Sequence, residues 1–347
     1  MVRFILGVVV FFTLVFTAAW FSLTHPDMSY AELDEKYAVS ASKFITLESG
    51  ARVHYLDSGP APENTTSPPL ILIHGYTSSS FEWSNWIKSL RGRYHIIAVD
   101  LPAHGLTEAS MNYIREEAGM VNFVDEFTQS LNLSSFVLGG SSLGGRISWE
   151  YSLIHPEKVD SLILIGADGW EVSETATSFD PIIKDLNSYP LLAPVLRFFD
   201  MKTFITARVQ QSFLNPDEAN PELIDRFSDF TFAPNHRKGL VELALQKHTL
   251  DPQRENSIPT LILQGEKDAI VPLSYATKFH QLAPNSTLLT YEMAGHNLHM
   301  EAPRRSLEDV LEFLTNEQRP RPRNSYQELE TSSYTRESDT VLPVSKN

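Results

Sequence analysis

The sequence of 347 residues contains no cysteine. Disulfide bonds, cysteine nucleophiles and metal sites with thiolate ligands are therefore excluded, whereas the cellular compartment is left open. Without covalent cross-links, stability has to come from a packed core. A chain of this length can bury one, either as a single domain with an insertion or as two domains.

Basic side chains are also scarce. Lysine and arginine number 28 against 43 aspartates and glutamates, which gives a formal net charge of −15. A protein that binds nucleic acid needs a basic surface to neutralise phosphates, so this balance argues against a nucleic-acid partner. The 11 histidines show no His-x-x-x-His or similar ligand spacing. We therefore expect no catalytic metal.

Charged residues are missing from Phe4 to Leu23, an apolar run long enough to cross a bilayer as a helix. A cleaved signal peptide is the alternative, and Thr17-Ala18-Ala19 is a weak candidate for its cleavage site. The length favours an uncleaved anchor within residues 1–25. Arg3 precedes the run and acidic residues follow it, so the rest of the chain is expected on the exported side of a membrane. Cleavage of the leader would instead give a secreted or periplasmic protein.

Short apolar runs recur along the chain and alternate with helical patterns. The runs typical of buried parallel strands are Leu70 to Ile73, Tyr94 to Val99, Phe136 to Leu138, Val159 to Ile165, Thr260 to Leu263 and Thr287 to Tyr291. Two alternating segments between Phe44 and Asp57 precede them and predict a hairpin. The pattern predicts an α/β fold with a mostly parallel, doubly wound sheet.

The alternation is interrupted after the strand that ends near Ile165. Residues 169–250 show helical patterns rich in phenylalanine, and we expect a helical cap there. An insertion at this edge of a parallel sheet lies over the crevice where ligands bind, although its aromatic side chains are equally consistent with a core of its own. Residues 40–168 and 251–317 would form the α/β core, and the polar residues 318–347 a disordered tail.

The stretch Phe136 to Trp149 joins a strand to a helix through Gly140-Ser141-Ser142-Leu143-Gly144. A serine at the apex of such a turn adopts a strained backbone angle, which is tolerated only where the residues two before and two after it lack side chains. This spacing selects Ser142 and not Ser141 as a nucleophile. The helix that follows directs its N-terminal N–H groups at any anion that forms beside the hydroxyl.

A serine hydroxyl needs a base within hydrogen-bond reach, and the base needs an acid to fix its tautomer. Asp268 and His296 each follow the carboxyl end of a predicted strand, so both are expected at the sheet edge that carries Ser142. Asp168, after an earlier strand, is the rival acid. His299 is the rival base, but its distance in sequence from the strand end is less suitable.

These features resemble the α/β-hydrolase fold superfamily. The motifs that carry the resemblance are His74-Gly75-Tyr76, Asp100-Leu-Pro-Ala-His-Gly105, Gly140 to Gly145, Gly265-Glu-Lys-Asp268 and Gly295-His296. The order Ser142, Asp268, His296 is also the order of that superfamily's catalytic triad. Ala103 departs from the pattern, because the superfamily commonly has glycine at this turn position. In layout, the chain is similar to membrane-anchored monoacylglycerol lipases and to bacterial lipases and carboxylesterases.

The resemblance implies an oxyanion hole formed by the backbone N–H groups of Tyr76 and Leu143. It also implies a serine esterase that needs no cofactor and acts on small apolar esters or lipids, among them monoacylglycerols. A serine at the elbow argues against epoxide hydrolases and haloalkane dehalogenases, which use an aspartate there. Peptidases, carbon–carbon bond hydrolases and perhydrolases keep the serine and stay open as alternatives. A non-catalytic binding protein is the remaining rival, against which the complete triad argues.

Overall fold

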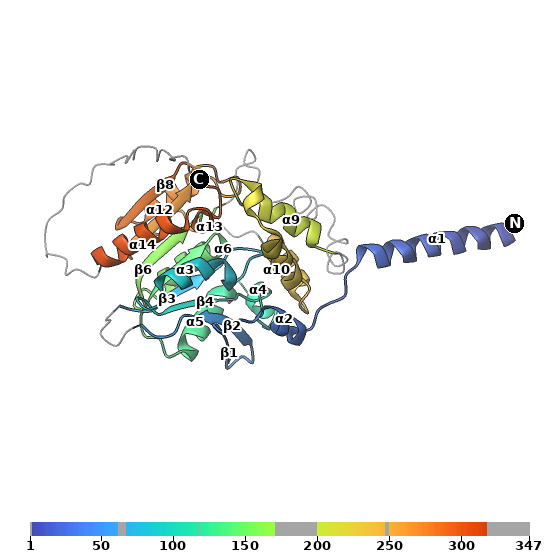
Figure 1. Ribbon diagram of the computed structural model, residues 1–347, viewed down its shortest axis with the longest axis horizontal. Coiled ribbons are helices and arrows are strands. Elements are labelled where there is room, and N and C mark those ends of the chain that lie inside the picture. The colour runs from blue at the N-terminus through green and yellow to red at the C-terminus, as the bar shows by residue number, and fades with distance from the viewer. Residues whose placement is uncertain (1, 62–66, 117, 171–199, 247–249, 318–347) are drawn as a thin grey trace, which may run out of the picture.

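The computed structural model describes residues 2–61, 67–116, 118–170, 200–246 and 250–317 (Figure 1). Its centre is an eight-stranded sheet with the order β1-β2-β4-β3-β5-β6-β7-β8. The strands are β1 (Ser42–Thr46), β2 (Arg52–Asp57), β3 (Leu70–Ile73), β4 (Ile96–Val99), β5 (Phe136–Ser141), β6 (Val159–Ile165), β7 (Thr260–Gly265) and β8 (Ser286–Tyr291). Strands β1 and β2 form the expected antiparallel hairpin, and β2 also pairs antiparallel with β4. All pairs from β4 to β8 are parallel, which confirms the predicted α/β fold.

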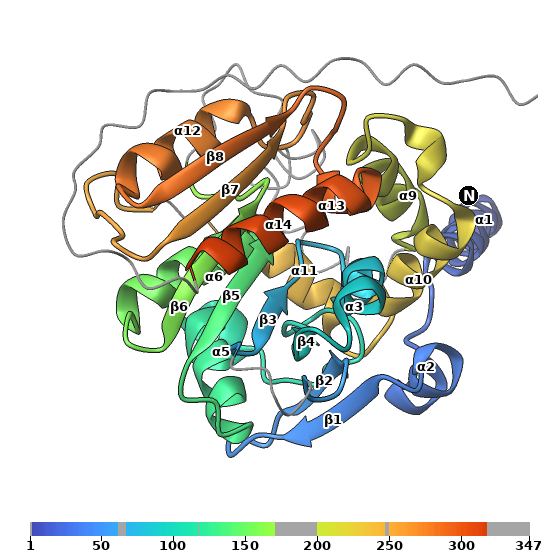
Figure 2. The same cartoon turned by 60° about the vertical axis from the view of Figure 1, so that its left-hand side comes forward.

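Helices cover both faces of this sheet (Figure 2). They are α2 (Tyr30–Tyr37), α3 (Ser84–Leu90), α4 (Asn112–Arg115), α5 (Gly119–Ser130), α6 (Leu143–Ile154), α12 (Leu273–Leu282), α13 (Leu298–Glu301) and α14 (Pro303–Glu317), with a 3-10 turn η1 (Ser80–Trp83) before α3. Each strand divides its side chains between two hydrophobic clusters, because successive residues point to opposite faces. In β3, Ile71 and Ile73 join the cluster under α5, α6 and α12, whereas Leu70 and Leu72 join the cluster under α3 and α14.

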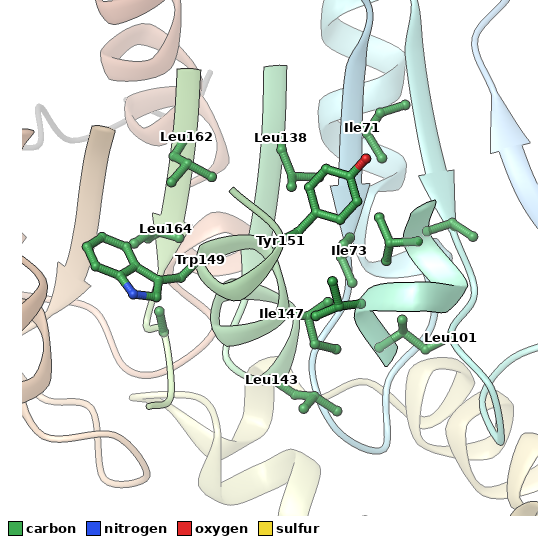
Figure 3. Close-up of a cluster of buried hydrophobic side chains, with 14 of the residues drawn as sticks. Ile71, Ile73, Leu101, Leu138, Leu143, Ile147, Trp149, Tyr151, Leu162 and Leu164 are labelled. Atoms are coloured by element: carbon green, nitrogen blue, oxygen red, sulfur yellow. The ribbon is translucent and has the colours of Figure 1, made fainter. Parts of the chain in front are cut away.

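The cluster beneath α6 holds the strand ends that carry the site (Figure 3). Figure 3 shows strand residues Ile71, Ile73, Leu138, Leu162 and Leu164 against helix residues Ile147, Trp149 and Tyr151. Trp149 and Tyr151 are fully buried, and each large side chain of this kind contributes about 2–3 kcal/mol of hydrophobic stabilisation. The packing of α6 against the sheet therefore holds the carboxyl end of β5 rigidly.

The described part of the expected cap consists of α9 (Lys202–Gln211), the 3-10 turn η2 (Pro216–Glu218), α10 (Pro221–Thr231) and α11 (His236–Leu245). These elements have a hydrophobic cluster of their own, in which Phe213 and Phe227 pack with Ile205 and Val209. These two phenylalanines thus belong to the core of the cap, although Phe227 also reaches a pocket described below. Residues 171–199 and 247–249 of the expected cap, and the expected tail over 318–347, lie outside the described residues.

The N-terminal helix α1 (Val2–Leu23) extends away from the sheet, and α9 and α10 lie between the two (Figure 1). Within the described ranges, none of the helices combines the length and the apolarity that crossing a membrane requires. The expectation of a membrane-spanning anchor over Phe4 to Leu23 is therefore not supported.

Candidate active site

Ser142 is the single residue between β5 and α6, and it has φ +52° and ψ −115°. Two glycines make this conformation possible. A Cβ on Gly140 would lie 2.2 Å from the carbonyl oxygen of Gly144, and a Cβ on Gly144 would lie 2.2 Å from that of Ile73. The backbone N–H of Ser142 donates to the carbonyl of Ile165 at 2.9 Å, which ties the turn to β6. The local sequence therefore holds one serine in a strained left-handed conformation at the sheet edge.

Asp268 and His296 meet at the same edge, beyond β7 and β8. His296 Nδ1 lies 2.8 Å from Asp268 Oδ2, and the two side chains are only 6% and 1% exposed. An ionised carboxylate can only accept hydrogen bonds, so this contact places a proton on Nδ1 and leaves Nε2 as an acceptor. This is the tautomer that a general base requires.

Four donors fix the Asp268 carboxylate. Its Oδ1 accepts from the backbone N–H groups of Ile270 and Val271, both at 2.8 Å. Its Oδ2 accepts from His296 and from Gln264 Nε2, the latter at 3.0 Å. Gln264 was not singled out in the sequence, although its place at the end of a buried strand was the available signal.

Ser142 and His296 line the same pocket. The loop from Gly75 to Ser78 and residues of the cap both form part of its wall. The cap contributes Arg208, Val209, Ser212 and Phe227 to the lining of the pocket. The core contributes Ser78, Glu82, Ile270 and Asn297. The cap thus covers the serine, and the lining combines apolar with polar groups, as expected of a ligand site.

Tyr76 and Leu143, the expected oxyanion-hole residues, flank Ser142. Leu143 is the first residue of α6, and Tyr76 lies in the pocket wall beside Gly75. A Cβ on Gly75 would approach Ser142 Cβ to 3.3 Å, so glycine lets this loop lie against the serine. His74 supports the loop, because its Nδ1 donates to the Gly75 carbonyl at 2.8 Å and its Nε2 accepts from the Leu101 N–H at 3.0 Å.

The two rival residues have other contacts. The Asp168 carboxylate accepts from the backbone N–H of Gly169 at 2.8 Å and lies 3.9 Å from Arg146. His299 stacks on Trp83 with ring centroids 4.6 Å apart, and its Nε2 is 3.5 Å from Glu82 Oε1. The geometry therefore favours Asp268 and His296 over Asp168 and His299.

Asp100, in the second motif, anchors the loops behind the site. Its carboxylate accepts from His54 Nδ1 at 2.7 Å and from the Ser80 N–H at 2.6 Å. Burial raises the pKa of Asp100, but the charge and hydrogen bond of His54, the charge of His74 and the Ser80 N–H together hold the pKa well below its usual value. Asp100 is thus a buried anion that fixes the start of η1, next to the loop of Tyr76.

Ala103, the departure from the usual glycine, has φ +64°. The left-handed conformation explains why glycine is common there, since a Cβ strains such a residue. The Ala103 methyl group occupies the space that a Cβ on Gly239 would need, because the two carbons would be 2.4 Å apart. A glycine in α11 of the cap thus accommodates the alanine in the core.

Comparison with known protein families agrees with the fold described above. A family model described as the alpha/beta hydrolase fold matches residues 68–303, more than half of the chain. The chain belongs to the α/β-hydrolase family. The match begins just before β3 and ends at the start of α14, so it includes every residue of the candidate site.

Among similar α/β-hydrolases is the uncharacterized hydrolase YugF of Bacillus subtilis, 27% identical over 80% of this chain and 99% of its own. The monoacylglycerol lipase ABHD6 of Bos taurus is 27% identical over 71% of this chain and 75% of its own. In fold, the chain is similar to a crystal structure described as a membrane phospholipase A and bacterial virulence factor. That similarity has a TM-score of 0.68 at 22% identity and covers 92% of this chain and 100% of the other.

Proposed function

We propose that this α/β-hydrolase is a serine esterase that cleaves carboxylic esters through an acyl-enzyme on Ser142. The observation that carries the proposal is the buried pair of His296 and Asp268, joined at 2.8 Å, whose histidine lines the same pocket as the strained serine. His296 Nε2 removes the hydroxyl proton as Ser142 Oγ attacks the ester carbonyl carbon. The same nitrogen then gives the proton to the departing alcohol, and a water molecule repeats both steps on the acyl-enzyme.

The oxyanion formed in each step is assigned to the backbone N–H groups of Tyr76 and Leu143. Leu143 follows Ser142 directly, and Tyr76 follows Gly75, which lies against Ser142. The N-terminus of α6 adds its positive dipole. Removing one such donor commonly costs about 10²–10³-fold in kcat. No cofactor takes part in these steps.

Apolar esters and lipids, among them monoacylglycerols, are the substrates we propose. Val209, Phe227 and Ile270 give the pocket apolar surface for an acyl chain, and the name of the Bos taurus relative points to the same class. Peptidases, carbon–carbon bond hydrolases and perhydrolases would use the same triad. No feature of the pocket favours those activities over ester cleavage.

A panel of nitrophenyl esters and monoacylglycerols of graded chain length tests the proposal. We expect hydrolysis that falls about 10⁴–10⁶-fold in Ser142→Ala, since single triad losses in serine hydrolases have costs of this order. Ser141→Ala is the matched control, because Ser141 ends β5 at the neighbouring position and should retain most activity. Ester hydrolysis that survives in Ser142→Ala would refute the assignment.

Membrane association through α1 is a separate proposal. Large apolar side chains along the helix are exposed, for example Phe4 at 76% and Phe16 at 72%. An apolar surface of this extent is typical of a site that contacts lipid or another protein, and we propose attachment to a bilayer surface. The protein should then stay in the membrane pellet through a high-salt wash, because salt weakens electrostatic but not hydrophobic attachment. Recovery in the supernatant before any wash would contradict it.

A further inference from the structure

The C-terminal end of α9 is hydrogen-bonded to the loop that carries His296, at the place where α13 approaches the cap (Figure 2). The carbonyl of Ser212 accepts from the Asn297 N–H at 3.0 Å, and Asn297 Nδ2 donates to Ser212 Oγ at 2.7 Å. The Leu214 N–H donates to Glu301 Oε2 at 2.9 Å. We call this contact, between residues 212–214 and residues 295–301, the cap clip.

Glu301 holds both sides of the cap clip at once. Besides the bond from Leu214, its two oxygens each lie 3.1 Å from the backbone nitrogen of Gly295, the residue directly before His296. Burial raises the pKa of Glu301, and the N–H groups of Leu214 and Gly295 oppose that shift by stabilising the ionised form. One carboxylate therefore joins the cap backbone to the peptide that leads into the histidine.

Gly295 shows how closely the two segments of the cap clip approach each other. A Cβ at this position would lie 2.7 Å from the Leu214 nitrogen and 3.1 Å from Glu301 Oε1. Real Cβ atoms essentially never come so near to backbone atoms, so any larger residue would push the cap away from the loop. The absence of a side chain at Gly295 and the carboxylate at Glu301 thus favour the same contact.

Both sides of the cap clip also line the pocket. Ser212 lines it from the cap side, next to Arg208 and Val209 of α9, and His296 and Asn297 line it from the loop side. The cap clip therefore helps to set the position of the cap wall relative to the base, together with other contacts between cap and core such as the hydrogen bond from the Tyr76 hydroxyl to the Leu240 carbonyl at 2.8 Å. A displacement of about 1 Å in such a contact can cost about 10²-fold in rate.

We infer that Glu301 is a positioning residue for the hydrolytic reaction. By accepting hydrogen bonds from the N–H groups of Gly295 and Leu214, it holds His296 and the cap in a fixed relative position. This inference rests on the proposed esterase function. Glu301 itself acts through the backbone of the cap clip and takes no part in proton transfer.

Three variants test this role. Glu301→Ala removes both acceptor oxygens, whereas Glu301→Gln keeps one oxygen, which in the Oε2 position can still accept from both N–H groups. Glu292→Gln is the matched control, because Glu292 is an exposed carboxylate in the same loop. With nitrophenyl acetate we expect kcat to fall about 10- to 100-fold in Glu301→Ala. We expect a much smaller loss in Glu301→Gln, and wild-type kcat in Glu292→Gln.

Two results would overturn the inference. Equal losses in Glu301→Ala and Glu301→Gln would mean that the charge matters and the hydrogen bonds do not. A lower melting temperature with unchanged kcat in Glu301→Ala would mean that Glu301 stabilises the fold and does not position His296.

Amide hydrogen exchange keeps this inference separate from the proposed function. We expect the Gly295 and Leu214 amides to exchange at least about 10-fold faster in Glu301→Ala than in the wild-type protein, without any substrate. Unchanged exchange would overturn the cap clip even in an active esterase. An inactive wild-type protein would refute the esterase, while the exchange rates would still decide whether the cap clip exists.

Discussion

Replacing Asp268 by asparagine should change the tautomer of His296, and the four hydrogen bonds of the carboxylate show why. Oδ1 accepts from two backbone N–H groups at 2.8 Å, so the asparagine side chain must keep its oxygen there. Its amide nitrogen then takes the place of Oδ2 and faces His296 Nδ1. Because an amide N–H donates, Nδ1 has to become the acceptor, and the ring proton moves to Nε2. A protonated Nε2 cannot accept the proton of Ser142.

Gln264 works against this orientation of the asparagine, but its side-chain amide can turn over, whereas the two backbone N–H groups at Oδ1 cannot. Its Nε2 donates to Asp268 Oδ2 at 3.0 Å and to the carbonyl of Val271 at 3.1 Å. Turning the Gln264 amide over to suit the variant would lose the bond to Val271. We therefore expect kcat to fall about 10⁴-fold, which corresponds to about 5 kcal/mol of lost transition-state stabilisation.

The assay is steady-state hydrolysis of nitrophenyl butyrate by variants whose circular dichroism matches that of the wild-type protein. Asp168→Asn is the control, because the Asp168 carboxylate contacts Gly169 and Arg146 and is 31% exposed. It should retain activity within about tenfold of wild type, since its loss disturbs no contact of His296. The reasoning is refuted if Asp268→Asn keeps more than a tenth of the activity, or if Asp168→Asn loses more than Asp268→Asn does.

The remaining predictions concern stability. Ala103→Gly should raise the free energy of unfolding by about 1 kcal/mol, because Ala103 has φ +64°. Gly239→Ala should lower the free energy of unfolding measured in urea, and should lower it less in a protein that also carries Ala103→Gly. Additive effects of the two substitutions would contradict the contact between positions 103 and 239. Burial lowers the pKa of His104 and His236, so the unfolded state binds protons first, and stability should fall as the pH drops below about 6.5. The lowered pKa of Asp100 adds a second loss below about pH 4, and urea midpoints that stay constant from pH 8 to pH 3 would contradict both.

The strands and the serine turn could be predicted because their signals are local. A continuous apolar run such as Leu70 to Ile73 indicates a buried parallel strand, and the glycines two residues before and after Ser142 indicate its strained turn. The positions of Asp268 and His296 followed from a topological rule, since parallel strands end at one edge of a sheet. The structure brings these two residues together at 2.8 Å.

Other features depend on contacts between distant segments. The bond between Leu214 and Glu301 joins residues 87 positions apart. Glu301-Ala-Pro303 matches the pattern of the α/β-hydrolases, but that match does not identify Leu214 as the partner of Glu301. Helix α2 was missed although Ser29 and Glu32 form a capping box, a local signal that the sequence does contain. The membrane span over residues 4–23 was expected from hydropathy and length, and the described helices do not support it.

An acyl-enzyme trapped during turnover would test the central claim most directly. A nitrophenyl ester of a bulky acid, which deacylates slowly, is mixed with the protein and quenched in acid, and the peptides are then mapped by mass spectrometry. The account predicts one acyl group per molecule, on Ser142, and none in Ser142→Ala. An acyl group on Ser141 or elsewhere, or turnover of the ester with no acylated peptide, would contradict it.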